Sequence, residues 1–353
     1  MAPTTTETTA QFEDVFRRHR RELLAHCYRM VGSASEAEDM VQETALRAWR
    51  SYGGFEGRSS VRTWLYRIAT NVCLSDLEGR ERRPLPTGLG APALPPDAPL
   101  VERGIDWLGP LPDALVASVD PAEVAVEMDS VRLAFVAALQ HLPARQRAVL
   151  VLCEVLRWSA AEAAQALETS VAGVNSALQR ARATMGQLGA TAESAAATGV
   201  DELDEHQRRM LDAYVAAFWR KDVAAIAALL TEDAVWEMPP WEGWYQGAQT
   251  IAALVDWNCP GQEHDMPMIA TRCNGQPAFG LYLRESCLPG PAEDDRGRGR
   301  DDVFVPFQLQ VLDLAGDRVG HVVAFFDPDA FSLAGLPAAM SAAEVAAIAP
   351  LSS

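Results

Sequence analysis

Residues 159–185 carry side chains of the types that read DNA, and their spacing predicts two short helices joined by a tight turn. Ser159 and Glu162 have the spacing of a capping box at the start of the first helix, and the second helix begins near Ser170. In a helix-turn-helix the second helix enters the major groove of DNA. An ordinary helical hairpin has the same spacing, so the pattern alone leaves both interpretations open.

The second of these helices divides into two faces. We expect Val171, Val174, Leu178 and Ala181 to face the core, because they recur at helical steps. The outward or flanking positions hold small, amide and guanidinium side chains, which suit base edges and phosphates. The candidate DNA-binding residues here are Ser170, Ala172, Asn175, Ser176, Gln179, Arg180 and Arg182.

A second candidate region interleaves basic and aromatic residues. Arg62 and Arg67 lie beside Trp64 and Tyr66 on a predicted helix over 60–77, and Arg58 and Phe55 lie in the glycine-rich segment just before it. Such side chains can follow a nucleic-acid backbone and stack on unpaired bases. Trp and Tyr at helical spacing also commonly fill a core, so this pattern too leaves two interpretations.

The elements that must position these residues follow from hydrophobic periodicity. Helical patterns cover residues 12–83, with a capping box expected at Ser35 and Glu38, and return over 128–185. Between them, residues 84–120 are rich in proline and predict an extended connector. From Asp201 two helices precede strand-like runs, which predicts an α+β domain with an antiparallel sheet. The predicted strands are 234–238, 268–272, 278–284, 303–314 and 318–326.

The charge is distributed unevenly along the 353 residues. The net charge of −18 would argue against a nucleic-acid partner, yet residues 11–83 carry a net +2 and residues 131–190 a net +3. Residues 200–353 carry −14. We therefore expect two mildly basic helical blocks and an acidic C-terminal half. The acidic half could shield the arginines from DNA until another partner rearranges the domains.

Other classes of protein find little support. The six cysteines form no CxxC pair, so we expect neither a metal site nor a disulfide framework, and no cofactor. No apolar run is long enough to span a membrane, and the start of the chain does not have the layout of a secretory signal. We expect a cytoplasmic protein of 49% hydrophobic and 22% charged residues that folds as two or three domains.

The runs HCYRMVGSASEAEDMVQETALRAWR (26–50), FEGRSSVRTWLYRIATNVCL (55–74) and LQHLPARQRAVLVLCEVLRWSAAEAAQALETSVAGVNSALQRARATM (139–185) resemble the extracytoplasmic-function sigma factors of the sigma-70 class. Residues 201–331 resemble the SnoaL-like cone fold that is fused to one subgroup of these factors, through the stretch ending in residues 236–240, the Trp244–Gly247 step, the turn at 274–278 and Leu309–Leu312. The resemblance implies a multidomain chain, with two all-α domains followed by an α+β domain. The expected parts are sigma domain 2 (11–83), an acidic linker (84–127), sigma domain 4 (128–188), a second linker (189–200), the SnoaL-like domain (201–336) and a tail (337–353).

The same resemblance implies roles for individual residues. Asp39, Gln42, Glu43 and Arg47 would contact core RNA polymerase, although their spacing alone favours a solvated polar face. The helix from Ser170 would read the −35 promoter element. The −10 element would be read and held open by Phe55, Arg58, Ser59, Arg62, Thr63, Trp64, Arg67 and Asn71.

A cone fold encloses an apolar pocket, and we expect a ligand pocket lined by Trp236, Met238, Trp244, Tyr245, Phe279, Tyr282 and His321. An acid or base could come from Glu237, Asp256, His264, Asp265 or His321, but the sequence places no pair at catalytic spacing, so no catalytic residue is assigned. Ligand sensing, docking on the sigma domains and a purely structural role stay open.

The sequence therefore predicts a non-catalytic factor that starts transcription with core polymerase at specific promoters and is regulated in cis by its C-terminal domain. The competing class is an enzyme or ligand-binding protein that keeps the sigma-like domains as a scaffold. Binding to core polymerase would favour the transcription factor, and its absence would favour the enzyme or ligand-binding protein.

Overall fold

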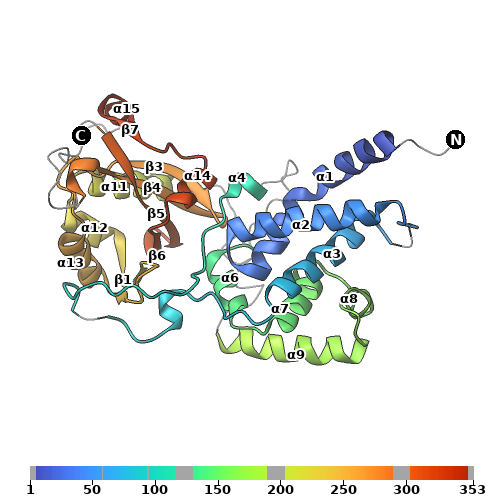
Figure 1. The fold of residues 1–353 in the computed structure, drawn as a ribbon. Helices are drawn as coiled ribbons and strands as arrows, with labels where there is room; N and C mark the ends of the chain where they lie inside the picture. The colour runs from blue at the N-terminus through green and yellow to red at the C-terminus, as the bar shows by residue number, and fades with distance from the viewer. Residues whose placement is uncertain are drawn as a thin grey trace. The chain divides into compact units, whose positions relative to one another are not determined.

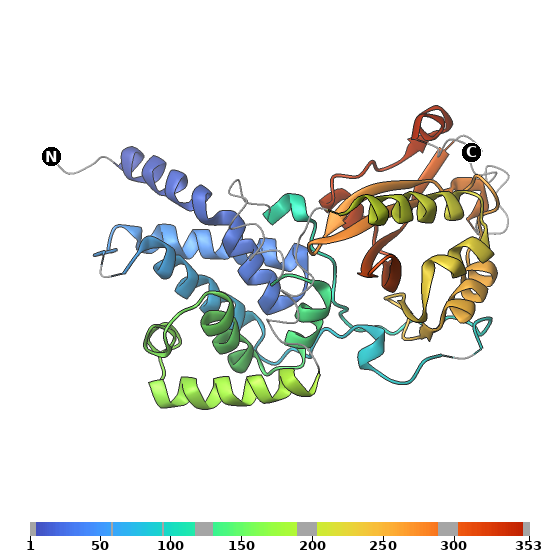
Figure 2. The ribbon, with the colours of Figure 1, turned by 180° about the vertical axis from the view of Figure 1, so that it is seen from behind.

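The computed structural model describes residues 5–57, 59–93, 95–116, 130–188, 203–288 and 303–348, with side chains from Gln11 onward. The chain divides into two compact units. The helical unit comprises Met1–Pro84 and Asp106–Val200, and the C-terminal unit comprises Leu85–Ile105 and Asp201–Ser353. Figures 1 and 2 show the chain from opposite sides.

Three helices form the first part of the helical unit: α1 (Thr5–Val31), α2 (Ala34–Tyr52) and α3 (Val61–Asp76), which pack on one another (Figure 1). Gly32 adopts a φ of +75° between α1 and α2, a conformation that favours glycine. Ser33 caps α2 by accepting a hydrogen bond from the backbone N–H of Glu36 at 3.4 Å. The predicted cap at Ser35 is therefore wrong by two residues, because the chain leaves the left-handed turn immediately before Ser33. The core of this part includes Leu23, Leu24, Cys27, Tyr28, Met30, Val41, Ala48, Leu65, Tyr66 and Ala69.

The second part of the helical unit contains α6 (Leu133–Gln140), α7 (Ala144–Leu150), a π-helical turn (Val151–Val155), α8 (Ala160–Ala166) and α9 (Val171–Gln187). The capping box predicted for α8 is present in full: Ser159 and Glu162 exchange both hydrogen bonds. Its small core consists of Phe135, Ala138, Leu139, Leu142, Leu150, Val151, Ala181 and Met185. The short helix α4 (Asp113–Val116) packs against α1.

The C-terminal unit is a curved sheet with helices packed on it. Its helices are α11 (Glu205–Trp219), α12 (Val223–Leu229), α13 (Ala248–Asn258), α14 (Pro328–Leu333) and α15 (Ala342–Ile348). Its strands are β1 (Leu230–Glu237), β2 (Trp244–Gln246), β3 (Met268–Cys273), β4 (Gln276–Arg284), β5 (Val303–Ala315), β6 (Arg318–Phe325) and β7 (Met340–Ser341). The strand order is β2-β1-β6-β5-β4-β3, with β7 paired to β5.

The α+β class and the five predicted strands agree with this structure, but one pairing does not. Strands β1 and β6 run parallel, with Trp236 opposite Val322, while the other described pairs run antiparallel. A parallel pair requires a long crossover, which the chain between β1 and β6 supplies. The expectation of a wholly antiparallel sheet was wrong, because strand periodicity does not encode which strands become neighbours.

The core of the C-terminal unit lies between the sheet and the helices α11, α12 and α13. Phe279 and Leu281 of β4 point into this core, whereas Tyr282 meets Phe331 of α14 with ring centroids 5.3 Å apart. Helix α14 therefore covers the opposite face of β4. The predicted C-terminal tail contributes β7, which pairs with β5, so residues 340–341 extend the sheet.

The segment Leu85–Ile105, here called the connector, is largely extended as the prolines predict, with a 3₁₀ turn at Pro86–Gly88 and a second turn at residues 95–98. It is fastened along the C-terminal unit: Ala93 N–H donates to Trp244 O at 2.7 Å and Arg103 N–H donates to Pro240 O at 3.1 Å. The predicted linker thus belongs in part to the C-terminal unit. Residues 117–127 and the predicted linker at 189–200 lie outside the described residues.

None of the helices in the described ranges has the length and apolar character that a membrane crossing requires.

Candidate functional site

The predicted base-stacking residues meet in an aromatic cluster at the end of α2 and the start of α3. The Phe55 ring lies 5.0 Å from that of Trp64, and the Tyr52 ring lies 6.3 Å from it on another side. Trp64 is 8% exposed, whereas Phe55 is half-buried. The expectation that Trp64 faces DNA disagrees with this placement, because the neighbouring rings cover the indole. Of the two aromatic side chains, Phe55 is the accessible one.

Arg62 lies at the exposed edge of α3. Its Nε donates to Glu22 Oε2 at 2.6 Å, and its guanidinium sits 4.8 Å from the centre of the Tyr66 ring. Burial raises the pKa of Glu22, but His19 and Arg62 outweigh it and hold that pKa below its ordinary value. The ionised carboxylate therefore orients Arg62, while 44% of the side chain stays exposed.

The other predicted −10 residues have varied surroundings. Arg67 and Ser59 are exposed. The backbone N–H of Thr63 donates at 3.0 Å to Oγ of Ser60, the residue that caps α3. Asn71 is half-buried, and its Nδ2 donates to Ala166 O at 3.4 Å. Arg58 lies outside the described residues. The exposed surface of α3 thus includes Arg62 and Arg67 but not Trp64.

The outer face of α2 carries the predicted polymerase contacts. Asp39, Gln42 and Arg47 are exposed, and Arg47 Nε donates to Glu43 Oε1 at 2.6 Å. The same face exposes two large apolar side chains that the sequence analysis did not select: Leu46 and Trp49, each 50% exposed. The signal was available, because both fall outside the buried stripe of α2 formed by Val41, Thr44 and Ala48. Exposed aromatic and aliphatic groups of this kind mark contact surfaces.

Helix α9 presents the predicted polar face. Ser170 caps the helix by accepting from Gly173 N–H at 3.0 Å. Arg180 donates to Ser176 Oγ at 2.7 Å, and Arg182 forms an ion pair with Glu154. The remaining predicted contacts of this helix, Ala172, Asn175 and Gln179, are all exposed.

The inward face of α9 differs from the prediction at its first turn. Val174 and Ala181 are fully buried and Leu178 packs on the core, as expected. Val171 is 46% exposed, so its predicted core position is wrong. Helical periodicity assigns a residue to a face of the helix but does not show whether another element covers it there.

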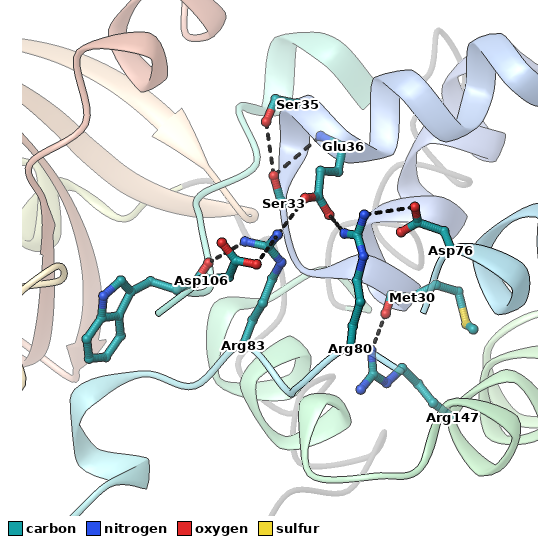
Figure 3. A network of polar contacts seen from close by, with 10 residues as sticks. Met30, Ser33, Ser35, Glu36, Asp76, Arg80, Arg83, Asp106 and Arg147 are labelled. Carbon is teal, nitrogen blue, oxygen red and sulfur yellow. Dashed lines mark hydrogen bonds and ion pairs between the residues drawn. The ribbon is translucent and has the colours of Figure 1, made fainter. Parts of the chain in front are cut away.

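The two parts of the helical unit are joined through a buried arginine. Arg147 of α7 is 4% exposed and donates to the carbonyl oxygens of Met30, Leu139, Gln140 and Leu142. Figure 3 shows its guanidinium pointing at the Met30 carbonyl at the end of α1. Burial lowers the pKa of Arg147 to about 10, so the group stays charged at neutral pH.

Other contacts join the same two parts. Arg29 of α1 is 2% exposed, and it donates to Ser130 Oγ at 2.6 Å and to Ser130 O at 3.2 Å. The rings of Tyr66 and Trp158 lie 6.3 Å apart. The helical domains that carry α3 and α9 are therefore packed together rather than apart.

A charged network fixes the end of the first helical part, as Figure 3 shows. Glu36, in the first turn of α2, accepts from Arg83 at 2.6 Å and from Arg80 at 3.0 Å. Arg80 also donates to Asp76, and Arg83 lies 3.5 Å from Asp106. The two ends of the chain that leave the helical unit for the connector, at Arg83 and Asp106, are thereby held side by side.

The C-terminal unit contains a cavity of about 370 Å³. Side chains of α11, α13, β1 and β5 line it together with Leu100 of the connector. The lining is mainly apolar and includes Phe218, Trp236, Met238, Trp241, Leu254 and Phe326. Its size and lining are typical of sites that take a small apolar molecule.

The structure places two of the seven predicted pocket residues, Trp236 and Met238, on this lining. Tyr245 and Phe279 belong to the packed core. Tyr282 lies on the opposite face of β4, where it donates to Pro337 O at 2.8 Å, and Trp244 Nε1 donates to Gly90 O of the connector. The predicted list was therefore wrong in part, because aromatic character does not show which face of a strand a residue occupies.

His321, the seventh, pairs with buried Glu237: its Nε2 lies 2.7 Å from Glu237 Oε1. The other carboxylate oxygen of Glu237 accepts from Thr87 N–H of the connector at 2.7 Å. Neither residue lines the cavity. The pair thus fastens the connector rather than facing a substrate.

The remaining acid and base candidates lie elsewhere. Asp265 forms an ion pair with Arg284 at 2.5 Å, the His264 ring lies 4.9 Å from that of Trp219, and Asp256 is exposed. Burial raises the pKa of Asp265, but Arg284, Gln262 and Cys287 outweigh it and keep that pKa low. The five candidates do not converge on the cavity, and the described residues contain no cluster suited to a metal ion.

Comparison with known proteins gives three family matches in chain order: Sigma-70 region 2 over residues 15–83, Sigma-70 region 4 over 132–185, and a SnoaL-like domain over 211–273. The ECF RNA polymerase sigma factor SigG of Mycobacterium tuberculosis is 52% identical over 322 residues, covering 90% of this chain and 82% of SigG. The RNA polymerase sigma-H factor of Pseudomonas aeruginosa is 29% identical over 171 residues, covering 48% of this chain and 82% of that protein. The crystal structure of the ECF sigma factor SigJ of M. tuberculosis superposes with a TM-score of 0.56 at 22% identity, covering 92% of this chain and 99% of SigJ, which shows a shared fold.

Proposed function

This chain belongs to the extracytoplasmic-function sigma factors of RNA polymerase, and on that basis we propose which of its surfaces read the promoter and bind the polymerase. It is a non-catalytic transcription initiation factor with a SnoaL-like C-terminal domain. A sigma factor binds core RNA polymerase and promoter DNA. The promoter and polymerase contacts of individual residues are the proposal.

The −10 element would be read by the loop after α2 and the exposed edge of α3. Among the described residues there, Phe55, Arg62 and Arg67 are accessible aromatic and cationic side chains. Trp64 would support Phe55 from below by ring packing rather than touch a base. The energy of stacking and phosphate contacts offsets the unstacking of bases, which costs a few kcal/mol for each flipped base.

The −35 element would be read by α9 in the major groove. The observation that carries this proposal is its continuous exposed face of Asn175, Ser176, Gln179 and Arg180 within the matched Sigma-70 region 4. An arginine can bond guanine edges and an amide can bond adenine edges. With few cations on this face, the free protein should bind DNA weakly and depend on polymerase.

Core polymerase would bind the outer face of α2. Asp39, Gln42 and Arg47 supply polar contacts, and Leu46 and Trp49 add apolar area that binding would bury. Interfaces of this kind take much of their energy from a few aromatic and arginine side chains.

The packed arrangement of the helical unit would have to open for promoter recognition. The names of the −10 and −35 elements place them about 25 base pairs apart, which is roughly 85 Å of duplex at about 3.4 Å per base pair. The contacts of Arg147 and Arg29 hold the two reading domains together instead. We infer that polymerase binding separates them, and that the free chain is a closed form.

The C-terminal domain would regulate this opening in cis through the connector, which joins the two sigma domains and is fastened along that domain. A small ligand in the C-terminal domain stays a prediction. The enzyme alternative gains no support from the cavity, because the catalytic candidates do not line it.

The test is reconstitution of the purified chain with core polymerase, followed by mapping of transcript starts on genomic DNA. We expect starts at sites that share −10 and −35 motifs, and Phe55→Ala should reduce promoter opening more than Ser35→Ala, a change at an exposed position of α2. If core polymerase neither binds the chain nor initiates with it, the proposal fails. A comparison of promoter binding by the full-length protein and by a truncation ending near residue 190 tests whether the acidic C-terminal half shields the arginines from DNA. Equal promoter binding by the two proteins at every salt concentration would reject this shielding.

A further inference from the structure

Two buried polar atoms at the cavity of the C-terminal unit have no hydrogen-bond partner among the described residues: Trp236 Nε1 and Gln308 Oε1. Both side chains line the cavity, and they are 1% and 5% exposed. An unpaired buried polar atom is costly, and most such atoms in folded proteins are satisfied. Their position at the cavity indicates that a bound molecule supplies their missing hydrogen-bond partners.

The chemistry of the lining restricts that molecule. None of the described lining side chains is a carboxylate, an imidazole, a guanidinium or an ammonium group. Burial raises the pKa of Cys259, which lines the cavity, to about 11, so this thiol is neutral as well. An ion in this cavity would lack a counter-charge, so the lining favours an uncharged and mainly apolar molecule.

The two unpartnered atoms specify the polar group. The indole N–H of Trp236 can only donate, and Gln308 Oε1 can only accept. A hydroxyl group does both, since its oxygen accepts and its hydrogen is donated. A carbonyl would satisfy the Trp236 N–H alone and leave Gln308 Oε1 unpaired.

The connector forms part of the same cavity. Leu100 contributes to the lining, and Asn258, another lining residue, donates to Pro96 O at 2.9 Å. The backbone of Trp241, which also lines the cavity, forms an isolated antiparallel β-bridge with the backbone of Glu102 in the connector. A molecule in the cavity would therefore add apolar contact to the connector and reinforce the side chains that hold it.

We propose that this cavity binds an uncharged, hydroxyl-bearing lipophilic molecule, and that its occupancy strengthens the docking of the connector. The proposal does not depend on promoter recognition, because neither polymerase nor DNA enters its test.

The test uses the full-length chain and three probes of one shape: 2-naphthol, naphthalene and 2-naphthoate. Isothermal titration calorimetry should show 2-naphthol binding most tightly and the anion 2-naphthoate most weakly. Trp236→Phe removes the indole N–H and Gln308→Leu removes the whole side-chain amide, Oε1 included, and both keep the lining apolar. Each should weaken 2-naphthol binding by about 2- to 10-fold and leave naphthalene binding nearly unchanged. Gln262→Leu, an exposed glutamine of the same unit, is the matched control and should change neither affinity.

Hydrogen exchange measures the second half of the proposal. Saturating 2-naphthol should slow amide exchange over residues 96–103 of the connector, and it should do so less in Gln308→Leu. Absence of 2-naphthol binding, equal or tighter binding of 2-naphthoate, or unchanged 2-naphthol affinity in both variants would overturn the ligand assignment. Binding that leaves connector exchange unchanged would overturn the coupling.

Discussion

Replacing Arg147 with methionine should release the two helical domains from each other. Methionine keeps most of the aliphatic stem but removes the guanidinium that bonds four backbone carbonyls. The buried carbonyls then lose a charged donor, and part of that loss is recovered because no charge is buried. We expect a net loss of about 2–4 kcal/mol in the free energy of unfolding of the helical unit.

That loss is large against the total stability of a domain, which is about 5–15 kcal/mol. For a unit of this size each kcal/mol lowers the melting temperature by about 2–4 °C, so Arg147→Met should melt about 4–16 °C below the wild type. The assay is differential scanning calorimetry of the full chain, with hydrogen exchange to locate the loss at the end of α1 and at residues 139–142.

Arg145→Met is the control, because Arg145 lies on the same helix and is exposed. It should change the melting temperature by little. If Arg147→Met melts together with Arg145→Met and the end of α1 keeps its protection, the buried arginine does not join the domains and the closed form loses its main support.

Three further outcomes follow from the structure. Burial, with Arg29 and Arg62 nearby, lowers the pKa of His26 to about 3 from the ordinary 6.5, so between these pH values only the unfolded chain binds the proton. The free energy of unfolding should therefore fall as the pH drops below about 6.5, by at most about 1.4 kcal/mol per pH unit from this group. Urea unfolding at pH 7.5 and 5.5 should show a smaller loss of stability in His26→Gln than in the wild type. Trp49→Ala should weaken binding to core polymerase by about 10-fold or more, whereas Trp257→Ala, at an exposed tryptophan of the C-terminal unit, should not; equal affinities would remove α2 from the interface. Arg180→Ala should reduce initiation at promoters with an intact −35 element by about 5- to 150-fold and blur discrimination there, and a larger effect of Arg182→Ala, whose guanidinium is paired with Glu154, would contradict the orientation of α9.

The cis-regulatory part of the proposal depends on the connector. Its fastening to Glu237 through Thr87, and to Trp244 through Ala93, means that a truncation near residue 190 removes the domain and frees the connector at once. A change in activity on truncation therefore reports both effects, while a Thr87→Pro variant, which lacks the donor N–H, disturbs the connector alone.

The sequence by itself determined the elements whose signals are local. The capping box at Ser159, the start of α9 near Ser170 and the polar face of α9 depend on residues a few positions apart, so periodicity and capping chemistry predicted them. The resemblance of its sequence runs to known families likewise implied the sigma domains and the SnoaL-like domain that the family matches support.

Only the tertiary structure decided which residues from distant parts of the chain meet. Arg147 donates to the Met30 carbonyl, 117 residues away in the sequence, and Thr87 N–H donates to the Glu237 carboxylate, 150 residues away. Trp236 and Gln308 line one cavity although they belong to different strands. A helical or strand period shows that a residue has an inward face but not what covers it, which is why Trp64 was expected at DNA and Val171 in the core. Burial and hydrogen-bond partners depend on packing between elements, and packing has no signature within a short window of sequence.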